Sequence, residues 1–183
     1  LPWPTWRYAS HGIRLERELL CSYGRDMVVV RWRLLGDAPS AVVLRVRPML
    51  SGRDFHALHQ ENAGVRSQAT VHEGRVTWQP YDALPAVLAF HNGEYHHGPD
   101  WYRHIHYRIE RERGLDHTAD WWSPGECEFT LTPGSVAELL FTTEQLESVD
   151  VAQIVAAERR RRAECPVSAP TDDALAQELW AAS

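Results

Sequence analysis

The stretch MVVVRWRLL, residues 27–35, decides the fold class. Its side chains fall on two alternating faces, one with Val28, Val30, Trp32 and Leu34 and the other with Val29, Arg31 and Arg33. A period of two is that of a β-strand, because successive side chains point to opposite sides of a sheet. The residues that follow, Gly36-Asp37-Ala38-Pro39, are turn formers and predict a hairpin to the next strand.

The same alternation continues along most of the chain. Further strands are expected at 42–47, 75–79, 86–91, 101–111, 127–131 and 137–143. Asn92-Gly93 is suited to a tight hairpin turn, and Pro133-Gly134 marks a second turn. Strands at this spacing, joined by Gly, Pro and Asn turns, indicate an all-β fold, an antiparallel sandwich.

The pattern changes after residue 143. Asp150 and Gln153 have the spacing of a capping box, and Val151, Ile154 and Val155 follow at helical spacing. We therefore expect a β domain over 1–147 and a linker helix with its linker over 148–170. An apolar stripe in 171–183 predicts one more helix, which we interpret as the start of a truncated α-helical domain.

Composition excludes several classes of protein. The 183 residues carry a net charge of −6, whereas proteins that bind nucleic acid usually present a basic face. No apolar stretch approaches the length of a membrane span, and the N-terminus lacks a secretion signal, so no membrane partner is expected. Cys21, Cys127 and Cys165 form no Cys-x-x-Cys pair, which fits a reducing cytoplasm and predicts no zinc site or disulfide framework.

The segment RDFHALHQEN, residues 53–62, gathers two His, two carboxylates, an Arg and an Asn just after a strand. Polar chemistry at a strand end usually serves a surface or a junction. Asp54, Glu61 and Glu126 can be proposed as a glycosidase acid pair. More ordinary roles fit them better, such as pairing with Arg53, Arg66 or Arg103, so no catalytic residue is predicted.

Histidines and aromatic residues offer two further hypotheses. A metal site needs about four ligands, of which His91, His104 and His106 could supply three, but half-exposed strand-face imidazoles are the stronger interpretation, and no metal or cofactor is predicted. Aromatic rings near loops and strand ends suit either a sugar platform or the sandwich core: Tyr95, Trp101, Tyr102, Trp121 and Trp122. The Arg side chains on the strands are interpreted as solvated sheet faces.

A colinear series of blocks carries a family resemblance: 3–8, 30–34, 45–48, 53–62, 91–93, 101–103, 113–116, 122–126 and 141–144. In this order they resemble the N-terminal domain of bacterial and archaeal glycogen debranching enzymes, which are amylo-α-1,6-glucosidases. Two positions depart from the family pattern, Cys127 where Phe is expected and His104 where Asn is usual.

The resemblance implies a β-supersandwich that precedes an (α/α)6 barrel, and the glycosidase carboxylates belong to that barrel. The chain would then be a non-catalytic domain, cut from a longer glycoside hydrolase, that docks on the barrel and contacts branched α-glucan. Ten residues are the candidates for binding carbohydrate or for facing the barrel: Arg53, Asp54, His56, His59, Glu61, Asn62, Trp101, Tyr102, Trp122 and Glu126.

Two alternatives stay open. A free-standing carbohydrate-binding module is suggested by the loop aromatics. A mutarotase-like sugar epimerase is the other, because supersandwich folds host that chemistry with a His and a carboxylate as acid and base. His56 or His104 would act with Glu61 or Glu126.

Overall fold

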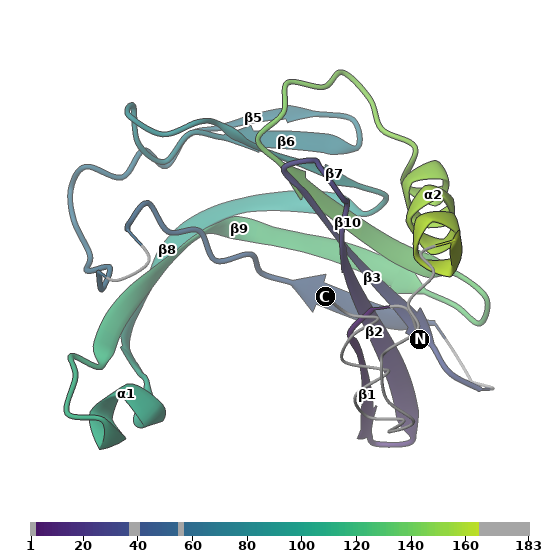
Figure 1. The fold of residues 1–183 in the computed structure, drawn as a ribbon, viewed down its shortest axis with the longest axis horizontal. Helices are drawn as coiled ribbons and strands as arrows, with labels where there is room; N and C mark the ends of the chain where they lie inside the picture. Colours follow the sequence, from purple (N-terminus) through teal and green to yellow (C-terminus); the bar gives the residue numbers. More distant parts are fainter. Residues whose placement is uncertain (1–2, 37–40, 55–56, 165–183) are drawn as a thin grey trace.

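The computed structural model describes residues 3–36, 41–54 and 57–164. Two antiparallel sheets make up most of this part (Figure 1). The larger sheet has the strand order β1 (Thr5–Ser10), β2 (Ile13–Cys21), β3 (Met27–Leu34), β10 (Val136–Thr142), β7 (Val87–His91), β6 (Arg75–Trp78) and β5 (Ala69–His72). The smaller sheet contains β4 (Val42–Val46), β9 (Thr118–Leu131) and β8 (Glu94–His106). The predicted all-β antiparallel sandwich is confirmed.

The main core lies between the two sheets. Trp32 of β3 packs near Phe129 of β9, with ring centroids 6.3 Å apart. Trp78 is fully buried, and its indole N–H donates to the Tyr95 hydroxyl at 3.0 Å. The predicted alternation of β3 is therefore confirmed, since one of its faces packs its apolar side chains between the two sheets.

A second apolar cluster lies on the outer side of the larger sheet, where helix α2 (Val151–Glu164) packs. Met27 and Val29 of β3 meet Val155 of this helix. The helix begins as predicted, because the Gln153 amide donates to the Asp150 carboxylate at 2.9 Å. The larger sheet thus buries apolar side chains on both of its faces.

Charged side chains fill the rest of that outer face. Arg31 pairs with Glu138 at 3.0 Å, and Glu16 is held by Arg7 at 2.9 Å and by Arg33. Arg7 first, and Arg33 with it, keep the pKa of Glu16 below its usual range. The interpretation as solvated residues is therefore wrong for Arg31, whose side chain is 17% exposed and ion-paired, whereas Arg33 stays 42% exposed while it pairs with the buried Glu16.

Two predicted hairpins are wrong, since β3 and β4, and also β7 and β8, belong to different sheets. Residues 37–40 lie outside the described part. At the second site, Asn92 instead anchors β10, donating to the Val136 carbonyl at 2.8 Å and accepting from the Glu138 amide at 2.9 Å. Gly93 lies so close to the Glu128 carbonyl that a side chain would not fit.

The strand expected over 101–111 ends at His106, and α1 (Arg108–Glu112) follows it. A bulge between Tyr102 and Ile105 breaks the predicted alternation, and His104 has a φ of +59° there. Gly114, with a φ of +72°, ends the short helix in the left-handed conformation that favours glycine. Ion pairs one turn apart, such as Arg108 with Glu112 at 3.4 Å, support the helix.

The C-terminal expectations are tested only up to Glu164. The helix predicted in 171–183 lies outside the described residues. The domain boundaries at 147 and 170 therefore stay predictions. In the part of the chain that the structure describes, no helix has the length and apolar character needed to cross a membrane.

Candidate functional site

Segment 59–62 joins the smaller sheet through Asp120 of β9. The Asp120 carboxylate accepts the amide of Glu61 and the amide of His104, each at 2.9 Å. The Asp120 amide donates back to the His59 carbonyl at 2.7 Å. Asp120 is only 7% exposed, and these amide donors hold the pKa of its carboxyl below the usual range. Asp120 thus connects segment 59–62 to the bulge of β8.

His59 is buried in the same region. Its Nε2 lies 2.8 Å from the Tyr81 hydroxyl, and its ring centroid lies 5.1 Å from that of Trp101. Burial, reinforced by the charge of Arg53, lowers the pKa of His59. The imidazole is therefore neutral at pH 7 and serves a polar network rather than proton transfer.

Asn62 and Glu61 complete this network. The Asn62 side chain donates to the Tyr81 hydroxyl at 2.9 Å, and its oxygen accepts the Gly64 amide at 3.0 Å. Glu61 forms a two-point ion pair with Arg103, one bond of which measures 2.7 Å. We call the set the polar junction: His59, Glu61, Asn62, Tyr81, Trp101, Arg103 and Asp120.

The remaining candidate residues are spread over several places. Trp122 is 2% exposed and its ring is buried, so it offers no platform for a sugar. Glu126 pairs with Arg47 at 2.8 Å, and the Arg47 guanidinium lies 5.8 Å from the ring of Tyr102. Asp54 is exposed, and His56 lies outside the described residues.

A pocket of about 1,030 Å³, which we call the α1 pocket, lies between segment 53–60 and the residues around α1. Arg53 and Gln60 line one side, and Tyr107, Asp116 and His117 line the other. The blocks 53–62 and 113–116, both of which carry the family resemblance, therefore meet at one place. Of the candidates that the structure describes, Arg53 lines this pocket.

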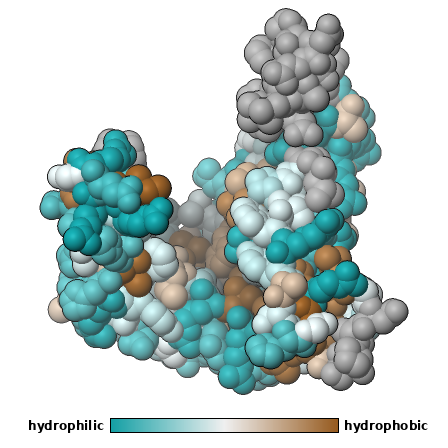
Figure 2. All heavy atoms as spheres, turned by 90° about the horizontal axis from the view of Figure 1, so that it is seen from below, coloured by the Kyte–Doolittle hydropathy of each residue, from teal (hydrophilic) through white to brown (hydrophobic). Residues whose placement is uncertain are grey.

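Figure 2 shows a wide hollow between the lobe that carries α1 and the arm formed by β1 and β2. Its floor is coloured as apolar surface, whereas both rims are largely hydrophilic. Apolar side chains are also exposed on the α1 lobe itself, where Ile109 is 62% exposed.

Five carboxyl groups of the described part have a shifted pKa. A general acid needs a raised pKa, but the carboxyls whose pKa departs from its usual value all have it lowered: Glu16, Glu61, Asp120, Glu144 and Glu158. Arg side chains or amide donors are the cause in each case. The described carboxylates with shifted pKa values are therefore held as stable anions.

Three of the histidines contact a backbone carbonyl or another ring. Nδ1 of His91 lies 2.9 Å from the Gly93 carbonyl, and the ring of His106 is 4.9 Å from that of His117. Among the described residues, no group of three His, Cys, Asp or Glu side chains has the arrangement of a metal site.

Tyr81, Tyr107 and Asp120 are central here and were not predicted. Tyr81 and Asp120 meet segment 59–62 from distant parts of the chain, and no local pattern reveals such a contact. Tyr107 accepts the Trp121 indole N–H at 2.8 Å, across the hairpin of β8 and β9. Trp121 pairs with Tyr102 in the strand register, so its bond to Tyr107 could not be read from the order of the residues.

The family comparison agrees with the block pattern. The family model described as glycogen debranching enzyme N terminal matches residues 1–137 of this chain. A comparison with curated proteins found no match. Since the matched region is well over half of the 183 residues, the chain belongs to the glycogen debranching enzyme N-terminal family.

Proposed function

We propose that this chain is a non-catalytic domain of a cytoplasmic glycogen debranching enzyme. In this proposal it supports a catalytic (α/α)6 domain of the same polypeptide and contacts branched α-glucan at the α1 pocket. The β domain extends over 1–147, and 148–170 links it to the catalytic domain, which begins in 171–183. Free thiols at Cys21 and Cys127 are in keeping with a reducing cytoplasm.

The observation that carries the glucan proposal is the meeting of two distant blocks at the α1 pocket. Its lining includes an amide at Gln60, a carboxylate at Asp116 and a phenol at Tyr107. Such groups both donate to and accept from hydroxyls, which is what a sugar offers. A volume of about 1,030 Å³ is at the upper end of the range for small-molecule sites, which suits an oligosaccharide.

The supporting role is favoured by the exposed apolar surface. Helix α1 buries none of its residues, and Ile109 in it and Leu115 just after it are exposed. A helical domain that packed there would remove this surface from water. The carboxylates of Glu61 and Glu126 favour a scaffold over a catalyst, because each is engaged in an ion pair with an Arg.

A free-standing carbohydrate-binding module is the second candidate, favoured by the same pocket. The two proposals differ in the activity that they predict for a longer protein. A protein that also contains the residues after Ser183 should release glucose from limit dextrin, whereas the 183-residue chain should release none. Glucan binding without hydrolysis by the longer protein would favour the binding module.

Affinity electrophoresis in native gels with and without glycogen tests the glucan contact. The 183-residue chain should be retarded by glycogen, and Asp116→Ala should reduce the retardation because it removes a pocket carboxylate. Glu112→Ala is the matched control, since Glu112 is an acidic residue of α1 that does not line the pocket. Unretarded wild type, or equal retardation of Asp116→Ala and wild type, would contradict the proposal.

A further inference from the structure

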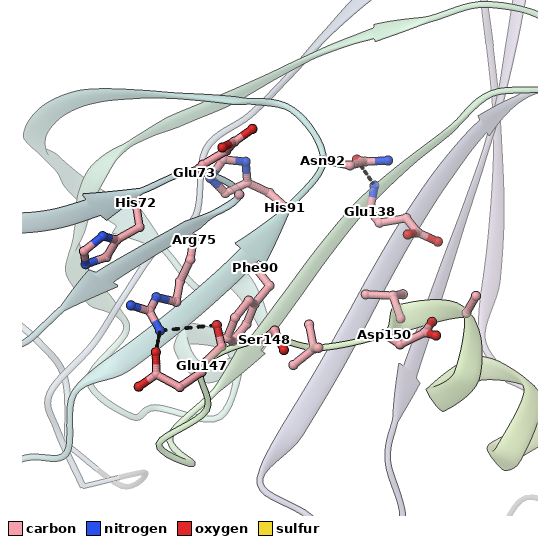
Figure 3. A pocket seen from close by; sticks show the side chains of 14 residues that line it. His72, Glu73, Arg75, Phe90, His91, Asn92, Glu138, Glu147, Ser148 and Asp150 are labelled. Carbon is pink, nitrogen blue, oxygen red and sulfur yellow. Dashed lines mark hydrogen bonds and ion pairs between the residues drawn. The ribbon is translucent and has the colours of Figure 1, made fainter.

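Two cavities of the described part differ in the charge of their linings. The cavity between the larger sheet and the start of α2, shown in Figure 3, has a volume of about 600 Å³. Its lining carries four carboxylates and one guanidinium: Glu73, Glu138, Glu147, Asp150 and Arg75. The α1 pocket instead carries two of each, at Glu110, Asp116, Arg53 and Arg113. Because its charges balance in number, the α1 pocket is the cavity that suits a neutral ligand.

The hydroxyl of Tyr107, which lines the α1 pocket, has its hydrogen-bond polarity set by Trp121. The indole Nε1–H of Trp121 donates to this hydroxyl at 2.8 Å in a solvent-exposed bond, and the two ring centroids lie 6.4 Å apart. An indole nitrogen is a donor only, so the hydroxyl oxygen accepts and its own proton points elsewhere. Among the described residues this hydroxyl makes no second hydrogen bond. Tyr107 is therefore a donor towards a ligand.

The ring of His117, which also lines the pocket, has the opposite polarity. Its Nδ1 lies 3.0 Å from the Leu115 carbonyl, which can only accept, so Nδ1 carries the proton. In the neutral ring, Nε2 is then a lone-pair acceptor. Within the described part of the chain, Nε2 has no hydrogen-bond partner and is not among the side-chain atoms that are buried without one. It therefore stays accessible to a ligand.

The backbone holds this donor and this acceptor as neighbours. The Tyr107 amide donates to the His117 carbonyl at 2.8 Å, across the hairpin of β8 and β9. The ring of His106 lies 4.9 Å from that of His117 and packs against it. A ligand at this place must supply a lone pair for Tyr107 and a proton for His117. Sugar hydroxyls supply both, because each one donates and accepts.

We infer that Tyr107 and His117 form a donor–acceptor pair that binds hydroxyls of a glucan in the α1 pocket, and that Trp121 positions the Tyr107 hydroxyl for this contact. The inference rests on the proposed function, since it names the groups that select a neutral sugar at the same pocket. Trp121 itself does not line the pocket, so it is a positioning residue that acts through Tyr107.

Affinity electrophoresis of the 183-residue chain over a series of glycogen concentrations tests the role of Trp121. Tyr107→Phe and Trp121→Phe each keep an aromatic ring and remove one polar group, and each should weaken glycogen binding by about two- to tenfold. The double variant should bind as weakly as Tyr107→Phe alone, because Trp121 acts through the hydroxyl. Trp6→Phe is the matched control, since Trp6 is 39% exposed and does not line the pocket. Its glycogen affinity should equal that of the wild type.

Nitrogen NMR of the His117 ring supplies the second readout. At a pH where the ring is neutral, the proton should be on Nδ1, and maltotriose should shift the Nε2 resonance. A proton on Nε2 would overturn the role of His117. So would an Nε2 resonance that maltotriose leaves unchanged while the Asp116 amide shifts.

The gel outcomes separate this inference from the proposed function. Retardation of the wild type that Asp116→Ala reduces, but that Tyr107→Phe and Trp121→Phe leave unchanged, would sink this inference alone. Losses of the two single variants that add up in the double variant would overturn the positioning role of Trp121. An unretarded wild type would contradict the glucan contact itself and this pair with it.

Discussion

The body of the sandwich and the α1 end of the smaller sheet are built from similar strands but are held together differently. In the body, Trp78 and Leu139 are fully buried between the sheets. At the α1 end, Trp121 and Leu115 remain substantially exposed, and polar contacts through Asp120 and Arg103 fix the chain. Packing thus stabilises the body, whereas hydrogen bonds and ion pairs shape an end whose apolar side chains stay exposed.

The largest expected effect on stability comes from removing one large ring from each region. Trp78→Ala should lower the free energy of unfolding by about 3–5 kcal/mol, because it leaves a cavity in a core that cannot collapse fully. Trp121→Ala should cost about 1 kcal/mol or less, since much of its ring is already in water. Urea denaturation measures both, and similar losses would contradict the comparison.

Helix α2 offers a second test, through a buried carboxylate of the body. Glu158 is 4% exposed and accepts from Nη2 of Arg161 and Nε of Arg162, each at 2.7 Å, and these partners lower its pKa to about 2. Glu158→Gln should cost about 1–3 kcal/mol at pH 7, because two charge-assisted bonds are weakened. Urea unfolding at pH 7 measures this loss.

The pH dependence of that loss follows from the sign of the shift. Because the pKa of Glu158 is lower in the folded chain than in the unfolded one, its contribution is complete above pH 4.5 and is lost as the pH falls towards 2. The wild type and Glu158→Gln should therefore converge in stability across this window. A difference that stayed constant from pH 7 to pH 2 would show that Glu158 is not the titrating group.

Asp120 gives the corresponding test at the α1 end. Asp120→Asn should lower the melting temperature and speed amide exchange at Glu61 and His104, because a neutral amide accepts their N–H groups less strongly. Exchange in β3 and β10 should change little, since the body does not depend on this carboxylate. Uniformly faster exchange across both sheets would mean that the two regions unfold together.

The smallest effect is expected at the bulge of β8. His104 adopts a φ of +59°, a conformation that Asn tolerates better than most residues. His104→Asn, which restores the residue usual in the family, should raise the free energy of unfolding by about 0.5 kcal/mol. Thermal denaturation should detect the gain, and a loss of stability would show that the His104 ring makes a contact of its own.

The sequence alone was informative wherever side-chain alternation meets a core. The faces of β3, the existence of its partner β10 and the Asp150 cap were predictable, because each depends on neighbouring residues, whereas its other partner β2 was not predicted. The links at 36–39 and 92–93 were not, since turn residues do not reveal whether the chain stays in one sheet or crosses to the other. The sequence predicted that the strand continues to residue 111, whereas residues 108–112 form a short helix. The alternation could not show this change, because the bulge at His104 already interrupts the strand before the helix begins.

The candidate site shows the same limit. The Glu61–Arg103 pair was among the ordinary roles considered, and it is formed. Trp122 looked like a sugar platform, but its position opposite Trp101 in the sheet buries it. The meeting of Asp116 with segment 53–60 depends on how β8 and β9 carry α1 back towards the loop. Such a contact is tertiary, so no local pattern predicts it.

The most direct test of the account is glucose release from limit dextrin by the 183-residue chain itself. We expect no release above an enzyme-free blank at any pH from acidic to neutral, because Glu61 and Glu126 are engaged in ion pairs and the proposal assigns hydrolysis to another domain. Release that exceeds the blank, and that Glu61→Gln or Glu126→Gln abolishes, would show that this domain carries out the hydrolysis and would contradict its role as a scaffold.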